Sequence, residues 1–223
     1  MEKWRRCQEL EASYISEGKY LQWGSDVSEQ FWTDKLLLDN TDGKILEVGC
    51  GPIGLFKFKE NVVGLDSIDY SENAKSEIFV HGMMEDLSRF EDDSFDMVIC
   101  CNSLDHGFNP ELAVKEMFRV SPKIVFWSNI FHPGTKKLMA IIDSQHPYHF
   151  SIDDVKKLFN INGNPYSNKV TKTGSEKLFN IYYSTAKTIH AKIKLIGSYI
   201  LGAKGLCIHI ERYNQHNIKE EVN

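Results

Sequence analysis

The chain has 223 residues, of which 42% are hydrophobic and 12% aromatic, which is enough for a sizeable core in one domain, with or without a cap. The formal net charge of −5 disfavours nucleic acid as the default partner. Residues 1–6 are too polar for a signal peptide, and no run approaches the ~20 apolar residues of a membrane span. The five cysteines have no CxxC spacing, which argues against a disulfide framework and against a structural zinc site. We therefore expect a cytoplasmic protein without stable membrane insertion.

The first forty residues are predicted to be mostly helical. Asp26 and Glu29 have the spacing of a capping box at the start of a second helix. We expect residues 1–40 to form an N-terminal helical cap that acts as a lid over the site that follows, while a brace over the sheet edge is the alternative. Apolar side chains of the first helix recur at helical spacing: Trp4, Cys7, Leu10 and Tyr14.

Strands alternate with helices in the remaining part, residues 41–223, and this pattern is typical of a parallel α/β sheet. Polar residues follow the carboxyl ends of consecutive strands, the edge where such sheets bind ligands. The predicted strands cover 45–48, 62–65, 78–80, 95–101, 123–127 and 206–210, and the predicted helices cover 55–59, 110–120, 151–159 and 177–200.

The first strand runs into a turn with three glycines, KILEVGCGPIG, over residues 44–54. Gly49 and Gly51 allow a sharp turn and let a ligand approach the backbone amides without a Cβ in the way. The same letters satisfy GxGxxG, which equally describes a dinucleotide site. Asp66 ends the second strand, where a carboxylate can accept both ribose hydroxyls of either ligand.

The segment after the third strand favours S-adenosylmethionine over a nicotinamide dinucleotide. Met84, Glu85 and Asp86 place an apolar side chain and a carboxylate where an adenine ring and its amine could lie. A dinucleotide also needs a helix amino end that faces its pyrophosphate. Here the predicted helix is short, and Glu47 adds negative charge that repels pyrophosphate but suits a sulfonium and an ammonium group.

These motifs occur in the order seen in class I S-adenosylmethionine-dependent methyltransferases, and residues 42–160 resemble the methyltransferase type 11 family. The resemblance implies a Rossmann-like, doubly wound seven-stranded sheet whose last strand is antiparallel. It departs from the family in the short helix after the turn and in the reduced turn Ser121-Pro122-Lys123. By position, the resemblance implies that Glu47, Gly49 and Gly51 border the methionine part, Asp66 holds the ribose, Met84, Glu85 and Asp86 border the adenine, and Asn102 contacts the methionine end.

Three histidines are the candidate catalytic residues. His106 follows the fourth strand beside the expected methyl position, and an imidazole with a pKa near ~6.5 suits a general base for a hydroxyl acceptor. His146 and His149 come from the loop after the fifth strand. The alternatives are that His106 caps the next helix and that the other two only pack the loop. No metal site is predicted, although Asp105 and Asp143 could meet in space.

The predicted function is transfer of a methyl group to a small or carrier-linked metabolite, with oxygen slightly favoured over nitrogen. The alternative is a non-catalytic S-adenosylmethionine-binding relative with a regulatory or partner role, and a homodimer is left open. The amphipathic helix predicted over residues 177–200 is an insertion in the domain. Its lysines form a solvated face or attract an anionic acceptor or a membrane surface.

Overall fold

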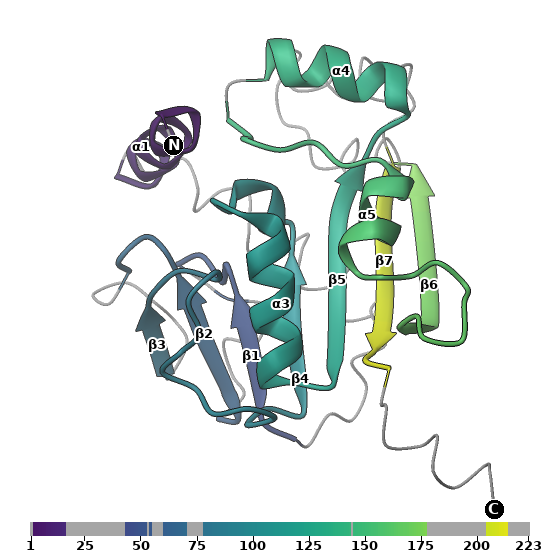
Figure 1. The fold of residues 1–223 in the computed structure, drawn as a ribbon. Helices are drawn as coiled ribbons and strands as arrows, with labels where there is room; N and C mark the ends of the chain where they lie inside the picture. The colour runs from purple at the N-terminus through teal and green to yellow at the C-terminus, as the bar shows by residue number, and fades with distance from the viewer. Residues whose placement is uncertain are drawn as a thin grey trace, which may run out of the picture.

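The computed structural model describes residues 2–16, 43–52, 54, 60–70, 78–143, 145–177 and 204–213. Figure 1 shows strands in one layer with helices packed against it and above its upper edge. In chain order the elements are α1 (Glu2–Ser16), β1 (Ile45–Val48), β2 (Val62–Asp66), β3 (Ile78–His81), β4 (Met97–Cys101), the 3-10 helix η2 (Leu104–His106), α3 (Pro110–Val120), β5 (Lys123–Ile130), α4 (Pro133–Ile142), α5 (Ile152–Leu158), β6 (Lys169–Lys177) and β7 (Lys204–Glu211).

The strands form one seven-stranded sheet in the order β3-β2-β1-β4-β5-β7-β6. Strands β1 to β5 pair in parallel, and β7 pairs antiparallel with both β5 and β6 (Figure 1). The predicted Rossmann-like sheet with an antiparallel last strand is therefore confirmed. Because β1 lies between β2 and β4, the chain changes direction across the sheet there, and the carboxyl end of β1 is the point where such sheets bind ligands.

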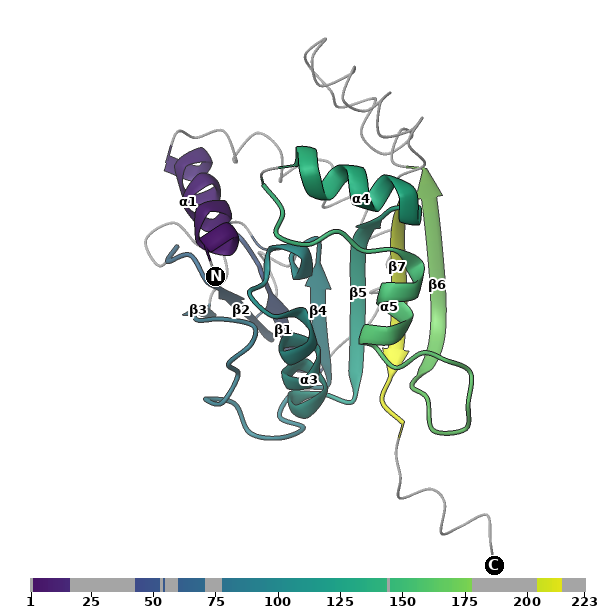
Figure 2. The ribbon, with the colours of Figure 1, turned by 45° about the horizontal axis from the view of Figure 1, so that its top comes forward.

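The core lies on both sides of the central strands. Every residue of β1 and β2 is buried, as expected for short, mostly apolar runs in the middle of a parallel sheet. On α3, Asn109 caps the helix by accepting a hydrogen bond from the Leu112 N–H, and Pro110 begins it. The buried side of α3 includes Met117, and Figures 1 and 2 show α3 and α5 on the same face of the sheet.

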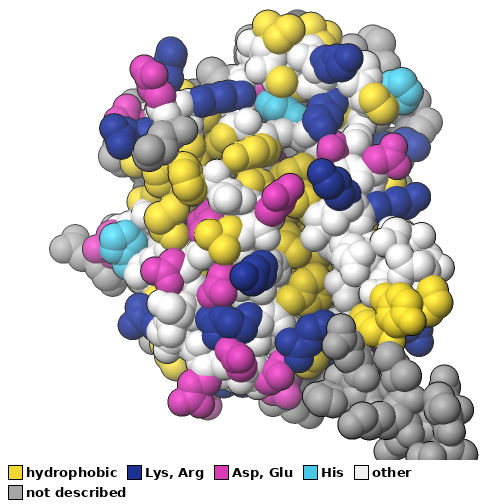
Figure 3. All heavy atoms as spheres, in the orientation of Figure 1, with side chains coloured by type: hydrophobic (Ala, Val, Ile, Leu, Met, Phe, Trp, Pro, Cys, Tyr) yellow, Lys and Arg dark blue, Asp and Glu magenta, His cyan; other side chains and the backbone are white. Residues whose placement is uncertain are grey.

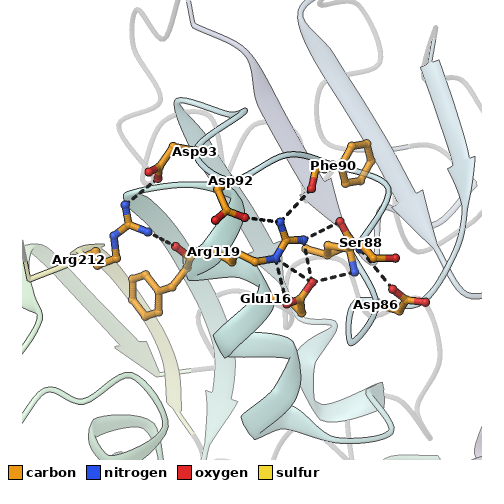
Figure 4. Close-up of polar contacts among 10 residues, drawn as sticks. Asp86, Ser88, Phe90, Asp92, Asp93, Glu116, Arg119 and Arg212 are labelled. Carbon is orange, nitrogen blue, oxygen red and sulfur yellow. Dashed lines mark hydrogen bonds and ion pairs between the residues drawn. The ribbon is translucent and has the colours of Figure 1, made fainter.

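An arginine on α3 anchors the connection between β3 and β4 (Figure 4). The Arg119 guanidinium donates to the carbonyl oxygens of Leu87 at 2.7 Å and Phe90 at 2.9 Å. It also pairs with Glu116 on its own helix at 2.9 Å and with Asp92 at 2.8 Å. These contacts hold in place the segment that carries the predicted adenine residues.

Helix α1 lies at the carboxyl edge of the sheet, where Figure 2 shows it on one side and α4 on the other. The Trp4 indole donates to the carbonyl oxygen of His106 at 3.0 Å, and its ring meets Phe108 edge to face. The Ser67 hydroxyl after β2 donates to the Gln8 side chain at 2.8 Å. This placement is compatible with a lid, which stays a prediction; residues 17–42, with the second predicted helix, lie outside the described part.

Two elements differ from the sequence prediction. Helix α4, which was not predicted, lies between β5 and the histidine-rich loop. Its apolar side chains Leu138, Ile141 and Ile142 are exposed. Figure 3 shows hydrophobic side chains at the top of the molecule, where α4 lies. Strand β6 was not predicted, and it contains Lys169, Lys172 and Lys177 of the lysine-rich block. The helix predicted over 177–200 lies outside the described residues, apart from Lys177. Within the described part of the chain, no helix has the length and apolar content needed to cross a bilayer.

Candidate cofactor and acceptor site

The glycine turn after β1 is tied to the end of β2. The Gly49 N–H donates to the carbonyl oxygen of Leu65 at 2.7 Å, and the Gly51 N–H donates to the Asp66 carboxylate at 2.9 Å. Gly49, Gly51 and Gly54 all have positive φ, between 59° and 68°, a conformation that side chains disfavour. The turn thus forms a backbone cradle directly above the carboxyl end of β1, as the sequence predicts.

Replacement of Gly49 by alanine is expected to destabilise the protein by about 2–4 kcal/mol and to abolish cofactor binding. An added Cβ would overlap the Cβ of Ser103 and lie 2.6 Å from its hydroxyl oxygen, in a backbone conformation that already disfavours alanine. Urea unfolding and calorimetric titration measure the two effects.

Gly163 provides the matched control because it has φ +76° but nothing within 4 Å of an added Cβ. Gly163→Ala should therefore show the backbone cost alone, about 1 kcal/mol. Equal losses in the two variants would mean that the close approach of Ser103 contributes nothing.

Asp66 ends β2 with a buried carboxylate. Its two oxygens accept hydrogen bonds from the N–H groups of Gly51 and Ile68, both at 2.9 Å. Burial raises the pKa of Asp66 to about 6 despite these bonds, and the nearby Glu11 adds to the increase. The carboxylate is held at the position predicted for a ribose contact, with its remaining lone pairs free to accept hydroxyl hydrogens.

The end of β4 provides the other wall of the cradle. Asn102 has φ +50°, its N–H donates to the carbonyl oxygen of Trp127 at 2.8 Å, and its side-chain Oδ1 is buried with no partner among the described residues. Ser103 donates to the carbonyl oxygen of Val48 at 2.9 Å, which links β4 to β1. Glu47 is buried beneath the turn, and an added Cβ on Gly54 would lie 3.4 Å from its carboxylate.

The predicted adenine residues have different surroundings. Met84 is buried, whereas Asp86 is exposed and accepts a hydrogen bond from the Ser88 N–H. Glu85 is buried, and its Oε1 accepts from the N–H groups of Phe108 at 2.5 Å and Asn109 at 2.9 Å, just before α3. Glu85 therefore braces the start of α3, a role that its place in the sequence does not reveal.

The three predicted catalytic histidines come together at the carboxyl edge. The rings of His106 and His146 have centroids 4.5 Å apart, and those of His146 and His149 are 6.1 Å apart. His106 lies in η2, four residues after Asn102, so the cluster adjoins the cradle. The convergence depends on contacts of the loop with η2: the Tyr148 N–H donates to the Asp105 carbonyl, and its hydroxyl donates to the Phe108 carbonyl.

Three carboxylates surround these imidazoles. Asp143 Oδ2 accepts hydrogen bonds from His146 Nδ1 at 2.7 Å and His149 Nε2 at 3.1 Å. Asp105 Oδ2 is 3.9 Å from His146 Nε2, and Glu11 Oε2 on α1 is 3.3 Å from His106 Nδ1. Sequence reasoning missed Glu11 entirely, because its position in an amphipathic helix gives no sign of a partner 95 residues away.

The contacts between carboxylates and imidazoles shift the pKa values of His106 and Asp143. Burial by itself would lower the pKa of His106, but Glu11 and Asp105 outweigh it and raise the pKa to about 9. Burial would raise the pKa of Asp143, but the hydrogen bonds from His146 and His149 hold it well below its usual range. At neutral pH His106 therefore carries a proton, whereas the base predicted from its reference pKa would be neutral.

Comparison with known proteins gives one family match and a set of solved structures with the same fold. Residues 46–123 match the family model described as a methyltransferase domain, while no curated protein matches the chain. The matched region contains the glycine turn, Asp66, Glu85 and the whole of β4. Over residues 46–123, this match supports the predicted resemblance to class I S-adenosylmethionine-dependent methyltransferases.

Solved structures with the same fold cover most of the chain. A S-adenosylmethionine-dependent methyltransferase from Thermotoga maritima has 16% identity and a TM-score of 0.59, over 90% of this chain and 97% of that chain. A methyltransferase in complex with the Haloferax volcanii Trm112 methyltransferase activator has 16% identity and a TM-score of 0.62, over 91% and 97%. Geranyl diphosphate C-methyltransferase from Streptomyces coelicolor, crystallised with Mg²⁺, geranyl diphosphate and S-adenosyl-L-homocysteine, has 13% identity and a TM-score of 0.63, over 83% and 78%.

These structures confirm the predicted fold. The match of residues 46–123 to a methyltransferase domain supports S-adenosylmethionine as the cofactor. The individual site residues stay predictions. The structure places Glu47, Gly49, Gly51, Asp66 and Asn102 around one cradle and His106, His146 and His149 beside it.

Proposed function

We propose that the protein transfers a methyl group from S-adenosylmethionine to a small or carrier-linked metabolite, with oxygen as the favoured acceptor atom. The observation that carries the proposal is the position of the histidine cluster. His106 lies in η2, directly after the Asn102–Ser103 corner of the cofactor cradle. An acceptor held by the cluster would thus lie next to the methionine end of the cofactor.

The residues of the cradle fit the cofactor. The unpartnered, buried Oδ1 of Asn102 provides an acceptor for the ammonium group at the methionine end. The Asp66 carboxylate is positioned to accept the ribose hydroxyls, and the positive φ of Gly49 leaves no Cβ between ligand and backbone. Buried Glu47 contributes negative charge, which favours a cationic ligand over a pyrophosphate.

The bound cofactor supplies a methyl group activated by a sulfonium, so catalysis requires mainly alignment of the acceptor and exclusion of water. We assign the alignment to His106, His146 and His149. His106, which carries a proton at neutral pH, donates a hydrogen bond to the acceptor oxygen more readily than it takes a proton. Imidazoles flanked by carboxylates suit a hydroxyl acceptor better than a carbon acceptor, which has no proton on a polar atom.

Parallel calorimetric titrations with S-adenosylmethionine, S-adenosylhomocysteine and NAD test the cofactor. We expect both sulfur ligands to bind with micromolar affinity and NAD not to bind. Binding of NAD alone would contradict the proposal.

Formation of S-adenosylhomocysteine with a panel of hydroxyl and amine acceptors then tests the reaction. His106→Gln is expected to reduce turnover at least about 100-fold at saturating cofactor. His132→Gln is the control, because His132 is exposed and only caps α4. Tight cofactor binding without turnover on any acceptor would instead favour the non-catalytic binding relative.

A further inference from the structure

The histidine cluster beside the cradle contains two groups of three residues that could bind a metal ion. Asp105, His106 and His146 each offer one nitrogen or carboxylate oxygen, and these three atoms lie within 4.8 Å of one another. Asp143, His146 and His149 form a second such group that shares His146. Two imidazoles and one carboxylate form a donor set that suits divalent first-row transition metals.

Asp105 is the member whose environment is incomplete. Its side chain is 8% exposed, and its Oδ1 has no hydrogen-bond partner among the described residues. Its other oxygen faces His146 Nε2 at 3.9 Å, which is longer than a hydrogen bond. A buried carboxylate oxygen without a donor is costly, and a bound cation would satisfy it.

Outer carboxylates already orient both imidazoles of the first group. His146 Nδ1 donates to Asp143 at 2.7 Å, and His106 Nδ1 lies 3.3 Å from Glu11. Metal-bound histidines usually have such a carboxylate on the nitrogen that does not bind the ion, because it fixes the ring and its tautomer. In the second group, by contrast, the Asp143 oxygen already accepts hydrogen bonds from both of its histidines.

The net charge of the cluster also favours a cation. Glu11, Asp105 and Asp143 contribute three negative charges to a partly buried site, against the positive charge of protonated His106, which a bound ion would replace, and Asp66 lies close enough to influence His106. No lysine or arginine contact to these carboxylates occurs among the described residues. A divalent ion would neutralise most of this charge.

We propose that Asp105, His106 and His146 bind one divalent first-row transition-metal ion, with Asp143 and Glu11 as the outer carboxylates that orient the two histidines. The proposal rests on the proposed function and specifies how the histidines act on the acceptor. When the ion binds, it displaces a proton from His106, and the ion takes the place of that N–H as the group that contacts the acceptor oxygen beside the methyl group.

The ion would give the acceptor a more acidic hydroxyl group, as bound cations do for water. The acceptor O–H proton leaves to solvent water, and the oxygen keeps the electron pair. That oxygen forms a bond to the methyl carbon as the carbon–sulfur bond breaks. The sulfur retains the electrons of the broken bond, which yields the methyl ether and S-adenosylhomocysteine.

Titration of the chelator-treated full chain with Zn²⁺ and Co²⁺ tests the site without any acceptor. We expect about one equivalent to bind with micromolar or tighter affinity, and Mg²⁺ to compete poorly because imidazole is a poor ligand for it. Asp105→Asn, His106→Gln and His146→Gln should each weaken Zn²⁺ binding at least about 10-fold, and Asp143→Asn should weaken it less. His132→Gln is the matched control and should bind like the unmodified protein.

Paramagnetic Co²⁺ shifts in the NMR spectrum of the unmodified protein provide a second measurement that does not depend on variants that fold. His106 and His146 ring signals should shift strongly, and those of His149 less. Absence of saturable ion binding overturns the proposal, and so does unchanged affinity in Asp105→Asn or an equal loss in His149→Gln. Failure of S-adenosylhomocysteine binding would instead contradict the proposed function, because ion titration needs no cofactor.

Discussion

Asp66→Asn is expected to weaken S-adenosylhomocysteine binding at least about 100-fold at neutral pH without destabilising the protein. The carboxylate can accept two ribose hydroxyls, and hydrogen bonds to a charged acceptor contribute roughly 1.5–3 kcal/mol each. An amide provides a single neutral oxygen. Calorimetric titration measures the affinity, and urea unfolding without ligand measures the stability.

The sign of the stability effect follows from the pKa of Asp66. Its pKa in the folded protein is raised to about 6, whereas an unfolded aspartate ionises near ~3.9. The ionised carboxylate therefore costs stability above about pH 6, and this cost disappears as the pH falls towards about 4. Asparagine carries no such cost, but its NH2 group cannot accept the hydrogen bond that one carboxylate oxygen accepts from Gly51 or Ile68, so the two effects offset and the variant should be about as stable at neutral pH.

Cofactor affinity, unlike stability, should decrease as the pH falls. As the pH falls through about 6, Asp66 takes up a proton and becomes a weaker acceptor, so the unmodified protein should lose affinity for S-adenosylhomocysteine. Glu11 and His106 face the same region and influence this titration. The Asp66→Asn variant should lack this pH dependence, and Asp153→Asn, on the exposed side of α5, should behave like the unmodified protein. A destabilised Asp66→Asn variant with normal affinity would contradict the assignment.

The cradle was predictable because its determinants are local in sequence. The strand before Gly49, the positive φ of the glycines and the carboxylate at the end of β2 each follow from short runs of residues. The parallel pairing of most strands followed from the alternation of strands and helices, and the antiparallel last strand followed from the resemblance. Hence the fold could be predicted from the motifs and the resemblance together, and the proposed cofactor rests on the same motifs.

Strand β6 could not be predicted because it lacks the alternation of apolar and polar residues that marks a half-buried strand. Its sequence, KVTKTGSEK, is almost entirely polar, and it is an edge strand that pairs only with β7. Lysines on such a strand discourage pairing with other chains. Only the pairing of β6 with β7 in the folded sheet identifies this segment as a strand.

The acidic partners of the histidines could not be predicted for a different reason. Glu11, Asp105 and Asp143 come from α1, η2 and the end of α4, and only the folded chain brings them around His106 and His146. The sequence suggested only that Asp105 and Asp143 could meet in space, and nothing in it indicated that they contact the histidines or that Glu11 joins them. The raised pKa of His106, which bears directly on its role, depends on two of these contacts.

Glu85→Ala is expected to lower the free energy of unfolding by about 2–4 kcal/mol, because the N–H groups of Phe108 and Asn109 lose a buried charged acceptor. Glu85→Gln should lose about 1 kcal/mol, since an amide oxygen can still accept these bonds. Urea unfolding measures both variants. Glu111→Gln is the matched control, because that glutamate lies on the exposed side of the first turn of the same helix.

The same variants separate the two roles of Glu85. If it acts as a brace for α3, Glu85→Gln should bind S-adenosylhomocysteine within about threefold of the unmodified protein, because the adenine loses no direct partner. If it contacts the adenine, as its motif position predicts, affinity should fall at least about 10-fold while stability is unchanged. The geometry favours the brace: Oε1 already accepts two backbone hydrogen bonds, and a Cβ added to Gly107 would approach it to 2.9 Å. A residue at a motif position can thus stabilise the start of a helix as well as contact a ligand.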